Sequence, residues 1–389
     1  MRILLLGNYA HDEQESMQRF ATCLAQALTR AGHQVRLLRP PAVVGQLWPS
    51  GHGVGKWLGY VDKFGPFPFV LRSAAQQADV VHICDHANAF YTGQLRLVPH
   101  VVTCHDLLAV RSALGQIPQN PTRWTGRQLQ GLILKGLSQA QHVACVSDAT
   151  RDDLLRIVTI GEHRVSRVYN SLNYPYSRMD AGQAASRLAK LGVDPGQPFV
   201  LHVGGNQWYK NRLGVLRIFS HLRKLTPAVK LKMVMAGKPW TAEMRRFVAE
   251  NELASVALEL TAVADEDLRA LYSTATLLLF PSLEEGFGWP IVEAQACGCP
   301  VATSKRSPMD EVAGDAAIYV DPENPAAAAA TLKQGLDRLP GREASLRNAA
   351  RFGHGMIDEY VALYEKVRQD RQTHQRFTEP RPLPKAISH

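Results

Sequence analysis

The amino-acid sequence predicts an α/β protein with two successive domains, each organised around a parallel β-sheet. Short apolar runs without alternation recur along the 389 residues, which is the pattern of strands covered on both faces. Segments with apolar residues at helical spacing separate these runs, and such alternation produces parallel sheets. The length fits about two domains. In such sheets a ligand usually binds in a cleft at the carboxyl ends of the strands.

The first half begins with a β-α-β unit. Arg2 to Gly7 is a short apolar strand, and apolar residues at helical spacing follow from Met17 to Leu28. A second strand, Gln34 to Leu38, stops at two prolines, so we expect a parallel pair with a right-handed crossover. Further strands are expected at Val80–Cys84, His100–Cys104, His142–Ser147 and Val165–Tyr169, with a helix near Arg127–Ser138.

The segment Val43 to Phe69 interrupts this rhythm. Its glycines between Gly51 and Lys56 superficially resemble a phosphate-binding loop, but the spacing fails and Trp57 follows the lysine. We therefore predict a flexible loop there. The aromatic residues and lysines that follow it would suit either a core helix under the loop or a segment at a membrane interface, and we favour the core helix.

The second half repeats the strand and helix pattern after a pause around Asn173 to Gly196, where Pro195-Gly196 predicts a domain junction. We expect domains over residues 1–175 and 190–352, a terminal helix over 353–370 and a loose basic tail over 371–389 that would help binding to acidic surfaces. Strands are predicted at Phe199–Val203, Leu231–Ala236, Val256–Leu260, Thr276–Phe280, Pro300–Thr303 and Ala317–Val320. Helices are predicted after Asn211, after Thr241, near Glu266–Tyr272, after Pro325 and over Met356–Val367.

Composition narrows the possible partners and the compartment. The net charge of +9 suits an anionic partner such as a nucleotide, a lipid phosphate or an anionic membrane. No nucleic-acid-binding motif is present, so we expect no nucleic acid partner. No apolar run approaches the roughly 18 residues that span a bilayer, and the apolar start is too short for a signal peptide. The six cysteines suggest buried reduced thiols in a cytoplasmic protein, and Cys297-Gly298-Cys299 lacks the second cluster that a metal site needs.

The stretch Leu283 to Gly298 has the pattern of a ligand site. A predicted strand enters a loop with two glycines, and Pro290 stands where a helix would begin. The free N–H groups and positive dipole end of such a helix attract anions. Glu285 and Glu293 would hold neutral hydroxyls of a sugar or ribose beside a phosphate held by the amides. A simple loop-to-helix cap with solvated glutamates fits the local pattern equally well.

Several residue groups together resemble glycosyltransferase family 4. In the second half they are Glu285-Gly286-Phe287-Gly288, Pro290, Glu293-Ala294, Gly298, Pro300-Val301, Glu311-Val312, Gly314-Asp315-Ala316 and Asp321-Pro322, with Val203-Gly204 and Lys210-Asn211 upstream. In the first half they are His105-Asp106, Val146-Ser147 and Thr150-Arg151. The resemblance covers nearly the whole chain. It implies the GT-B fold, in which two Rossmann-like domains face each other across a cleft and the last helix crosses back to the first domain.

The resemblance also assigns roles to residues. Glu285 would contact the hydroxyls of the donor sugar and stabilise charge at the reacting carbon, and Glu293 would hold the ribose. Lys210 would neutralise the departing diphosphate. His105 would lie by the sugar from the opposite domain, although a histidine capping a strand end is an alternative. The backbone amides of Gly286, Phe287 and Gly288 would hold the sugar and phosphates.

The sequence departs from the family pattern in two places. Many relatives have an arginine where Gly205 stands, and Arg212 or Asn206 would have to replace it at the diphosphate. The first loop of relatives often has two glycines where this chain has Glu15-Ser16. Asn8 and Ser16 of that region would bind phosphate or acceptor, with Glu15 directed away.

The expected function is a retaining transfer of a hexose from a nucleotide-diphosphate sugar to a glycan or lipid-linked saccharide acceptor. The donor would be UDP-, GDP- or ADP-linked, and no metal or other cofactor is expected. A front-face displacement, in which the departing phosphate accepts the proton of the acceptor, would need no separate base. A nucleotide-sugar 2-epimerase of the same fold and a non-catalytic relative are the alternatives. A nicotinamide dehydrogenase is disfavoured because Gly7 lacks the further glycines of that fingerprint.

Overall fold

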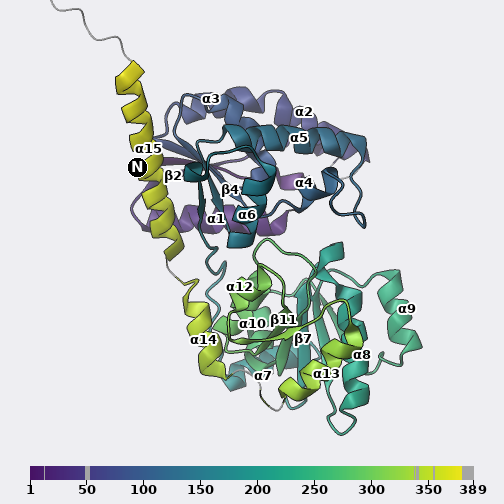
Figure 1. Ribbon diagram of the computed structural model, residues 1–389. Helices are drawn as coiled ribbons and strands as arrows, with labels where there is room; N and C mark the ends of the chain where they lie inside the picture. Colours follow the sequence, from purple (N-terminus) through teal and green to yellow (C-terminus); the bar gives the residue numbers. More distant parts are fainter. Residues whose placement is uncertain (13, 49–52, 337, 339–340, 354, 379–389) are drawn as a thin grey trace, which may run out of the picture. The chain divides into compact units, whose positions relative to one another are not determined.

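The computed structural model describes residues 1–12, 14–48, 53–336, 338, 341–353 and 355–378 of the chain. These form two compact units, each with a six-stranded sheet (Figure 1). The first unit comprises Met1–Cys145, Asp153–Val168 and the chain from Ile357 onward. The second comprises Val146–Asp152 and Tyr169–Met356. All strand pairs in both sheets are parallel, as the sequence predicts.

The sheet of the first unit has the strand order β2-β1-β3-β4-β5-β6. Its strands are β1 (Arg2–Leu6), β2 (Gln34–Leu38), β3 (Val80–Ile83), β4 (His100–Cys104), β5 (His142–Cys145) and β6 (Val165–Arg167). The helices are η1 (Ala10–Asp12), α1 (Glu15–Arg30), η2 (Gly45–Leu47), α2 (Gly53–Phe64), α3 (Phe67–Ala75), η3 (His86–Gln94), α4 (Leu108–Ala113), α5 (Trp124–Gln139), η4 (Glu162–Arg164) and α15 (Gly355–Thr378). Helix α6 (Asp148–Ile157) starts in the second unit and ends in the first.

The sheet of the second unit has the order β12-β11-β10-β7-β8-β9. Its strands are β7 (Phe199–Gly204), β8 (Lys232–Gly237), β9 (Ala257–Thr261), β10 (Leu277–Phe280), β11 (Val301–Ser304) and β12 (Ala317–Val320). The helices are α7 (Ala181–Lys190), η5 (Trp208–Lys210), α8 (Arg212–Leu225), α9 (Ala242–Glu250), α10 (Asp265–Thr274), α11 (Trp289–Ala296), α12 (Met309–Ala313), α13 (Pro325–Leu336) and α14 (Arg342–Ala350).

Both faces of the second sheet are buried, which explains the absence of alternation in its strands. Leu278 and Phe280 of β10 belong to one apolar cluster, and Leu277 and Leu279 belong to another. Successive side chains of a strand point to opposite faces, so a strand with a core on each side must be apolar throughout. Strands β7 and β10 are neighbours in the sheet, so their carboxyl ends, which precede the candidate residues Lys210 and Glu285, lie side by side.

The last helix, α15, packs on the first sheet through two buried tyrosines. The Tyr364 hydroxyl lies 2.6 Å from Nδ1 of His82, and the Tyr360 hydroxyl lies 2.8 Å from Oγ1 of Thr103. His82 Nε2 and Thr103 Oγ1 are 2.7 Å apart, so the four side chains form one buried polar network. Burial lowers the pKa of His82 to about 3, and the ring therefore stays neutral there.

Three local predictions differ from the structure. The predicted flexible loop at Gly51 to Lys56 is wrong from Gly53 onward, because α2 begins at that residue; residues 51 and 52 lie outside the described part. The pause around Asn173 to Gly196 contains helix α7, which Asp180 caps by accepting from the backbone N–H groups of Gly182 and Gln183. The predicted loose tail is helical as far as Thr378, and Arg381 and Lys385 are not among the described residues.

The change from the first unit to the second falls between Val168 and Tyr169, ahead of α7 and of Pro195-Gly196. Helix α7 packs against α10 of the second unit, and Ala184 and Leu188 lie in the apolar core of that unit. The Pro-Gly pair therefore marks a turn between α7 and β7.

Candidate functional site

The turn between β10 and α11 has the backbone that the sequence predicts for a ligand site. Gly288 directly precedes α11 with a φ of 98°, and a Cβ atom there would lie 3.2 Å from Cδ1 of Ile291. Such a φ strains residues with a side chain, so glycine is required. Trp289 is the first residue of α11 and Pro290 the second, which places Glu293 at the fifth helical position.

Lys210 and Glu285 form a close ion pair at the carboxyl ends of neighbouring strands. Lys210 Nζ lies 2.7 Å and 2.9 Å from the two carboxylate oxygens of Glu285. The side chains are 16% and 7% exposed, respectively. Lys210 follows β7 and Glu285 follows β10, so the parallel sheet joins residues that are 75 positions apart. The Lys210 ammonium also lies 5.2 Å from the ring centre of Phe280.

Glu293 is directed into the unit, where it has a tyrosine partner. The Tyr272 hydroxyl of α10 donates a hydrogen bond of 2.9 Å to Glu293 Oε2, and the glutamate is 5% exposed. Burial and the negative charge of Glu293 raise the pKa of Tyr272 well above its ordinary value. Tyr272 therefore remains a hydrogen-bond donor and holds one oxygen of Glu293 in a fixed position.

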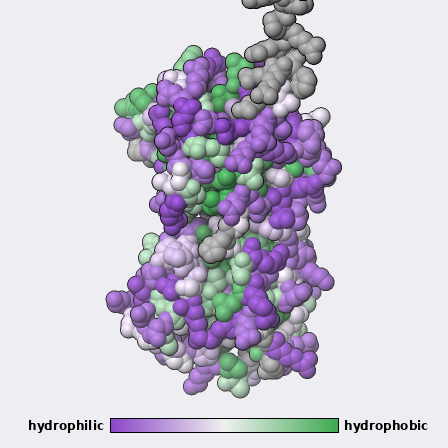
Figure 2. All heavy atoms as spheres, turned by 90° about the vertical axis from the view of Figure 1, so that its left-hand side faces the viewer, coloured by the Kyte–Doolittle hydropathy of each residue, from purple (hydrophilic) through white to green (hydrophobic). Residues whose placement is uncertain are grey.

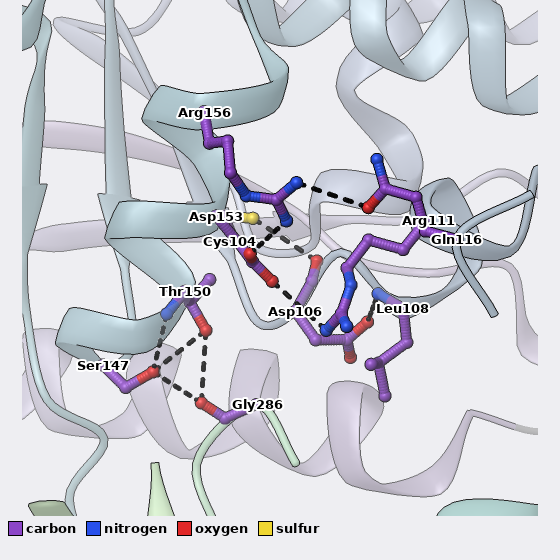
Figure 3. A network of polar contacts seen from close by, with 10 residues as sticks. All are labelled: Cys104, Asp106, Leu108, Arg111, Gln116, Ser147, Thr150, Asp153, Arg156 and Gly286. Atoms are coloured by element: carbon purple, nitrogen blue, oxygen red, sulfur yellow. Dashed lines mark hydrogen bonds and ion pairs between the residues drawn. The ribbon is translucent and has the colours of Figure 1, made fainter. Parts of the chain in front are cut away.

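The loop that contains Glu285 is braced by the segment that leads into α6. The carbonyl oxygen of Gly286 lies 2.8 Å from Ser147 Oγ and 3.2 Å from Thr150 Oγ1 (Figure 3). The two hydroxyls are also 2.9 Å apart. Val146-Ser147 and Thr150-Arg151 carried part of the family resemblance without a role, and the structure shows that Ser147 and Thr150 anchor the backbone next to Glu285. Phe287 lies in the apolar core and is 4% exposed.

Arg212 joins two loops at the carboxyl end of the same sheet. Its Nη1 donates to Oδ1 of Asn206 and, at 2.7 Å, to the carbonyl oxygen of Lys238, and Asn206 donates to the carbonyl oxygen of Pro239 at 2.8 Å. Arg212 is 4% exposed, and its Nε and Nη2 have no hydrogen-bond partner among the described residues. Burial lowers the pKa of Arg212. Gly205 contributes only backbone to this arrangement.

His202 is a buried polar residue near the pair that sequence reasoning did not single out. Its Nδ1 lies 3.0 Å from the carbonyl oxygen of Leu279 in the adjacent strand, while Nε2 has no partner among the described residues. Burial, together with the positive charges of Arg212 and Lys210, lowers the pKa of His202 to about 3. The only available signal was a histidine inside an apolar strand.

A second polar cluster lies in the first unit at the carboxyl ends of β1, β3 and β4. Asn8 follows β1 and donates through Nδ2 to Asp85 Oδ2 at 2.5 Å and to Gln14 Oε1 at 2.6 Å. Its Oδ1 is buried without a hydrogen-bond partner among the described residues. His105 follows β4, is 4% exposed, and has Nε2 2.9 Å from the carbonyl oxygen of Cys84. Burial lowers the pKa of His105, and the charge of Asp85 only partly offsets this.

Asp85 and His86 complete this cluster, and the sequence reasoning missed both. Asp85 Oδ1 accepts from the Ala87 backbone N–H at 2.9 Å and lies 3.2 Å from His86 Nδ1. Burial alone would raise the pKa of Asp85, but the hydrogen bond and charge of His86 lower it well below its ordinary range. Burial opposes charge on His86, yet the hydrogen bond to Asp85 raises the pKa of His86. Two titratable residues directly after an apolar strand were the available signal.

Ser16 stands apart from the buried members of this cluster. It lies in the first turn of α1 next to Glu15, and both residues are exposed. The structure thus brings Asn8 and His105 together around Asp85 in the first unit, and Lys210 and Glu285 together in the second. Among the described residues, no group of three or more histidine, cysteine, aspartate or glutamate side chains is arranged to hold a metal ion.

Two successive parallel-sheet units of this topology make up the GT-B fold. Residues 17–174 match the family model described as Glycosyltransferase Family 4, and residues 185–351 match the model described as Glycosyl transferases group 1. The chain belongs to glycosyltransferase family 4.

Characterised relatives agree with this assignment. The chain is 27% identical to O-antigen chain mannosyltransferase B of Escherichia coli over 266 residues, which cover 67% of this chain and 68% of the relative. It is 28% identical to D-inositol 3-phosphate glycosyltransferase of Rhodococcus jostii over 319 residues, covering 75% and 69% of the two chains.

Solved structures share the fold at low sequence identity. Anabaena HepE, determined in complex with UDP and glucose, has a TM-score of 0.72 at 15% identity, and the match covers 94% of this chain and 99% of HepE. WaaG, a glycosyltransferase involved in lipopolysaccharide biosynthesis, has a TM-score of 0.66 at 16% identity, with 95% and 99% covered.

Proposed function

We propose that this family member is a retaining glycosyltransferase that moves a hexose from a nucleotide-diphosphate sugar to a glycan or lipid-linked saccharide acceptor. The observation that carries the proposal is the ion pair of Lys210 and Glu285 beside the amino end of α11. One cation, one carboxylate and the N–H groups of a helix start together suit a ligand that has both phosphates and hydroxyls. The relatives that transfer mannose to O-antigen support a saccharide acceptor.

In this proposal the donor diphosphate takes Lys210 as its cation. An ammonium has three N–H donors, so Lys210 can contact a phosphate oxygen while it keeps one bond to Glu285. Positive charge at this position stabilises the diphosphate as it departs, and the low exposure of the pair strengthens that effect. Glu285 then contacts the sugar hydroxyls and stabilises positive charge at the anomeric carbon, and Glu293 holds the ribose.

The reaction requires no other base and no metal ion. The acceptor oxygen forms a bond to the anomeric carbon on the face from which the diphosphate departs, and the electron pair of the broken bond remains on the diphosphate oxygen. That oxygen takes the proton of the acceptor hydroxyl. The anomeric configuration is retained because the new bond forms on the same face as the old one.

We assign acceptor binding to the cluster of the first unit. Asn8 is held by two acceptors on its Nδ2, which leaves Oδ1 as a buried acceptor that a sugar hydroxyl would satisfy. His105, kept neutral by burial, would contact the sugar or the acceptor without adding charge. Ser16 lies on the exposed first turn of α1, where it would contact a phosphate of the acceptor.

We further propose a cytoplasmic location with peripheral contact to an anionic membrane. Free cysteines fit a reducing compartment, and the charge of +9 favours an anionic surface. Among the described residues, no helix is both long enough and apolar enough to cross a bilayer.

The proposal is tested by transfer assays on variants of the ion pair. Glu285→Gln and Lys210→Ala should each lower the turnover number at least about a hundredfold, since each removes a charge that acts in the transition state. The assay measures labelled sugar transferred from UDP-, GDP- and ADP-hexoses to lipid-linked saccharides, and NMR of the product gives its anomeric configuration.

Two sets of variants separate catalysis from folding. Glu250→Gln and Lys224→Ala, both exposed in the second unit, should transfer sugar at the wild-type rate. The double variant Lys210→Met/Glu285→Gln leaves no unpaired buried charge, so it should stay folded and remain inactive. Wild-type turnover by Glu285→Gln would contradict the assigned role, and an inverted product would exclude the retaining mechanism. Release of an isomerised sugar nucleotide without any acceptor would instead indicate an epimerase.

A further inference from the structure

Large apolar side chains are exposed together on the helices that follow β2 in the first unit. Trp57, Val61 and Phe64 lie at spacings of four and three residues on α2, so they share one side of that helix. They are 59%, 51% and 43% exposed, and Phe69 of α3 is 73% exposed. We call the following exposed residues the aromatic face: Leu47, Trp48, Trp57, Val61, Phe64, Phe69, Val70 and Leu97.

The elements that carry the aromatic face are in contact with one another. Helix α2 contacts η2 and α3, and α3 contacts η3, which precedes Leu97. Arg72 of α3 donates to Gln94 of η3 at 2.6 Å, which fixes this neighbourhood. The opposite side of α3 is buried through Phe67 and Leu71. The helix therefore packs on its unit without the exposed side chains of Phe69 and Val70. Figure 2, which faces the side of α15, shows a mostly hydrophilic surface on the first unit with a few hydrophobic side chains among the polar ones.

The stretch of sequence that carries the aromatic face has more basic than acidic residues, and Asp12, which contacts α2 from outside this stretch, pairs with Lys63 at 2.6 Å. Residues 43–147 contain eight lysines and arginines but only four carboxylates, which are Asp62, Asp79, Asp85 and Asp106. Asp62 and Asp85 are buried, Asp79 pairs with Arg2 at 2.8 Å, and Asp106 is half-buried and accepts from the Leu108 N–H. The exposed cations of this region are Lys56, Arg72, Arg96, Arg123, Arg127 and Lys135.

Asp62 shows why the carboxylate on α2 adds no negative charge to this surface. It accepts hydrogen bonds from the Tyr9 hydroxyl at 2.9 Å and from the backbone N–H groups of Val43, Val44 and Gly45. Burial opposes its charge, but these hydrogen bonds lower the pKa of Asp62 below its ordinary value. Its charge is therefore directed inward, where it holds the segment before η2 against α2.

We propose that the aromatic face is a docking surface for an anionic lipid bilayer. Aromatic side chains beside cations fit the boundary between headgroups and acyl chains, where rings are buried and basic groups contact lipid phosphates. A second copy of the chain fits poorly, because a symmetric contact would bring the same positive surface against itself. This inference rests on the proposed function in one respect, which is that docking on a bilayer would bring the enzyme to a lipid-linked acceptor.

Co-sedimentation of the full chain with vesicles tests this docking surface. The wild type should bind vesicles of phosphatidylglycerol with phosphatidylcholine at low salt and should bind pure phosphatidylcholine vesicles at least about tenfold more weakly. The variant Trp57→Ser/Phe69→Ser should lose at least about tenfold in partitioning to the anionic vesicles. Both replaced side chains are exposed, so the fold should persist, and thermal unfolding verifies this.

The matched control replaces exposed apolar residues of the second unit. Leu225→Ser/Val229→Ser, at residues 38% and 44% exposed, should bind vesicles as the wild type does. A charge variant, Lys56→Glu/Arg96→Glu, should lose binding to anionic vesicles. The fluorescence of Trp57, taken as the difference between the wild type and Trp57→Phe, should shift to shorter wavelength when anionic vesicles are added.

Three outcomes would overturn the proposal. In the first, the wild type fails to bind anionic vesicles. In the second, the Trp57→Ser/Phe69→Ser variant binds them as well as the wild type does. In the third, sedimentation velocity shows that the wild type is a dimer and that this variant is a monomer. Failure of the enzymatic proposal remains distinguishable, since the Glu285→Gln variant should bind vesicles like the wild type. A chain that binds vesicles but transfers no sugar would refute the enzymatic function and leave the docking surface standing.

Discussion

At the scale of single residues, the ion pair of Lys210 and Glu285 is better explained by ligand chemistry than by stability. A largely buried pair must be desolvated, and its attraction often does no more than offset that cost. An apolar pair would serve folding at least as well. The pair instead places opposite charges at the carboxyl end of a parallel sheet, next to a helix start, where a phosphate and a sugar hydroxyl would find partners in the proposed function.

Asp85 gives the first unit a stability that depends on pH. We expect Asp85→Asn to lower the free energy of unfolding by about 3 kcal/mol near pH 6, because His86 loses its buried carboxylate partner. The folded pKa of His86 is raised, so its contribution is complete below its unfolded pKa and disappears as pH rises through the folded pKa. The folded pKa of Asp85 is lowered, so its contribution is present above its unfolded pKa and disappears as pH falls through the folded pKa.

Urea denaturation of the wild type and of Asp85→Asn between acid and alkaline pH measures this difference. The gap between the two proteins should be widest between the unfolded pKa values of aspartate and histidine, and it should narrow as pH rises past the folded pKa of His86. Asp152→Asn is the matched control, because the Asp152 side chain is 74% exposed. A gap that stays constant over the whole pH range would show that Asp85 acts only through its bonds to Asn8 and Ala87.

At the scale of elements, the start of α6 depends on a side chain that is distant in sequence. Glu311 of α12 accepts from the backbone N–H of Asp148 at 2.8 Å and from that of Ala149 at 3.4 Å. These are the first residues of α6, whose N–H groups have no partner within the helix. A carboxylate at this position also interacts favourably with the helix dipole.

Replacing Glu311 should therefore destabilise the second unit modestly. We expect Glu311→Ala to lower the free energy of unfolding by about 1 kcal/mol, which is the usual cost of a lost helix cap. Glu343→Ala is the control, since the Glu343 side chain is 91% exposed on α14. Thermal denaturation of both variants measures the effect. Equal stability of the two variants would mean that water replaces Glu311 at the helix start.

At the scale of the whole molecule, the two units should respond differently to a nucleotide. A ligand that binds only the folded second unit stabilises that unit by about 2.7 kcal/mol when its free concentration is a hundred times its dissociation constant. Differential scanning calorimetry with UDP, GDP and ADP should show one nucleotide raising the unfolding temperature of the second unit. The same nucleotide should leave Lys210→Ala nearly unshifted. A shift confined to the first unit would place the donor there and contradict the assignment of Lys210.

The sequence also predicted much of the candidate site, though not its contacts. Glu285 and Gly288 were identified because a strand, a glycine turn and a helix start form a local pattern, whereas Lys210 was identified only through the resemblance to the family. Asp85 and His86 were missed because their significance depends on Asn8, which is 77 positions from Asp85. No local pattern reveals such a partner.

By itself the sequence determined the parallel character of both sheets, most of their strands and the turn before α11. These features follow from the apolar character of neighbouring residues and from the φ preferences of glycine and proline, all of which act within a few positions. Only the start of α2 escaped, because the glycines between Gly51 and Lys56 favour a loop, whereas the aromatic residues after them were expected to form a helix.

Only the tertiary structure decided which side chains meet. It joined Lys210 to Glu285 across 75 positions, braced Gly286 with Ser147 across 139 positions, and packed Tyr364 of α15 on His82 across 282 positions. The physical reason is that the strand order of a sheet brings together the ends of strands that are distant along the chain. That order depends on the packing of the whole unit, which no short stretch of residues specifies.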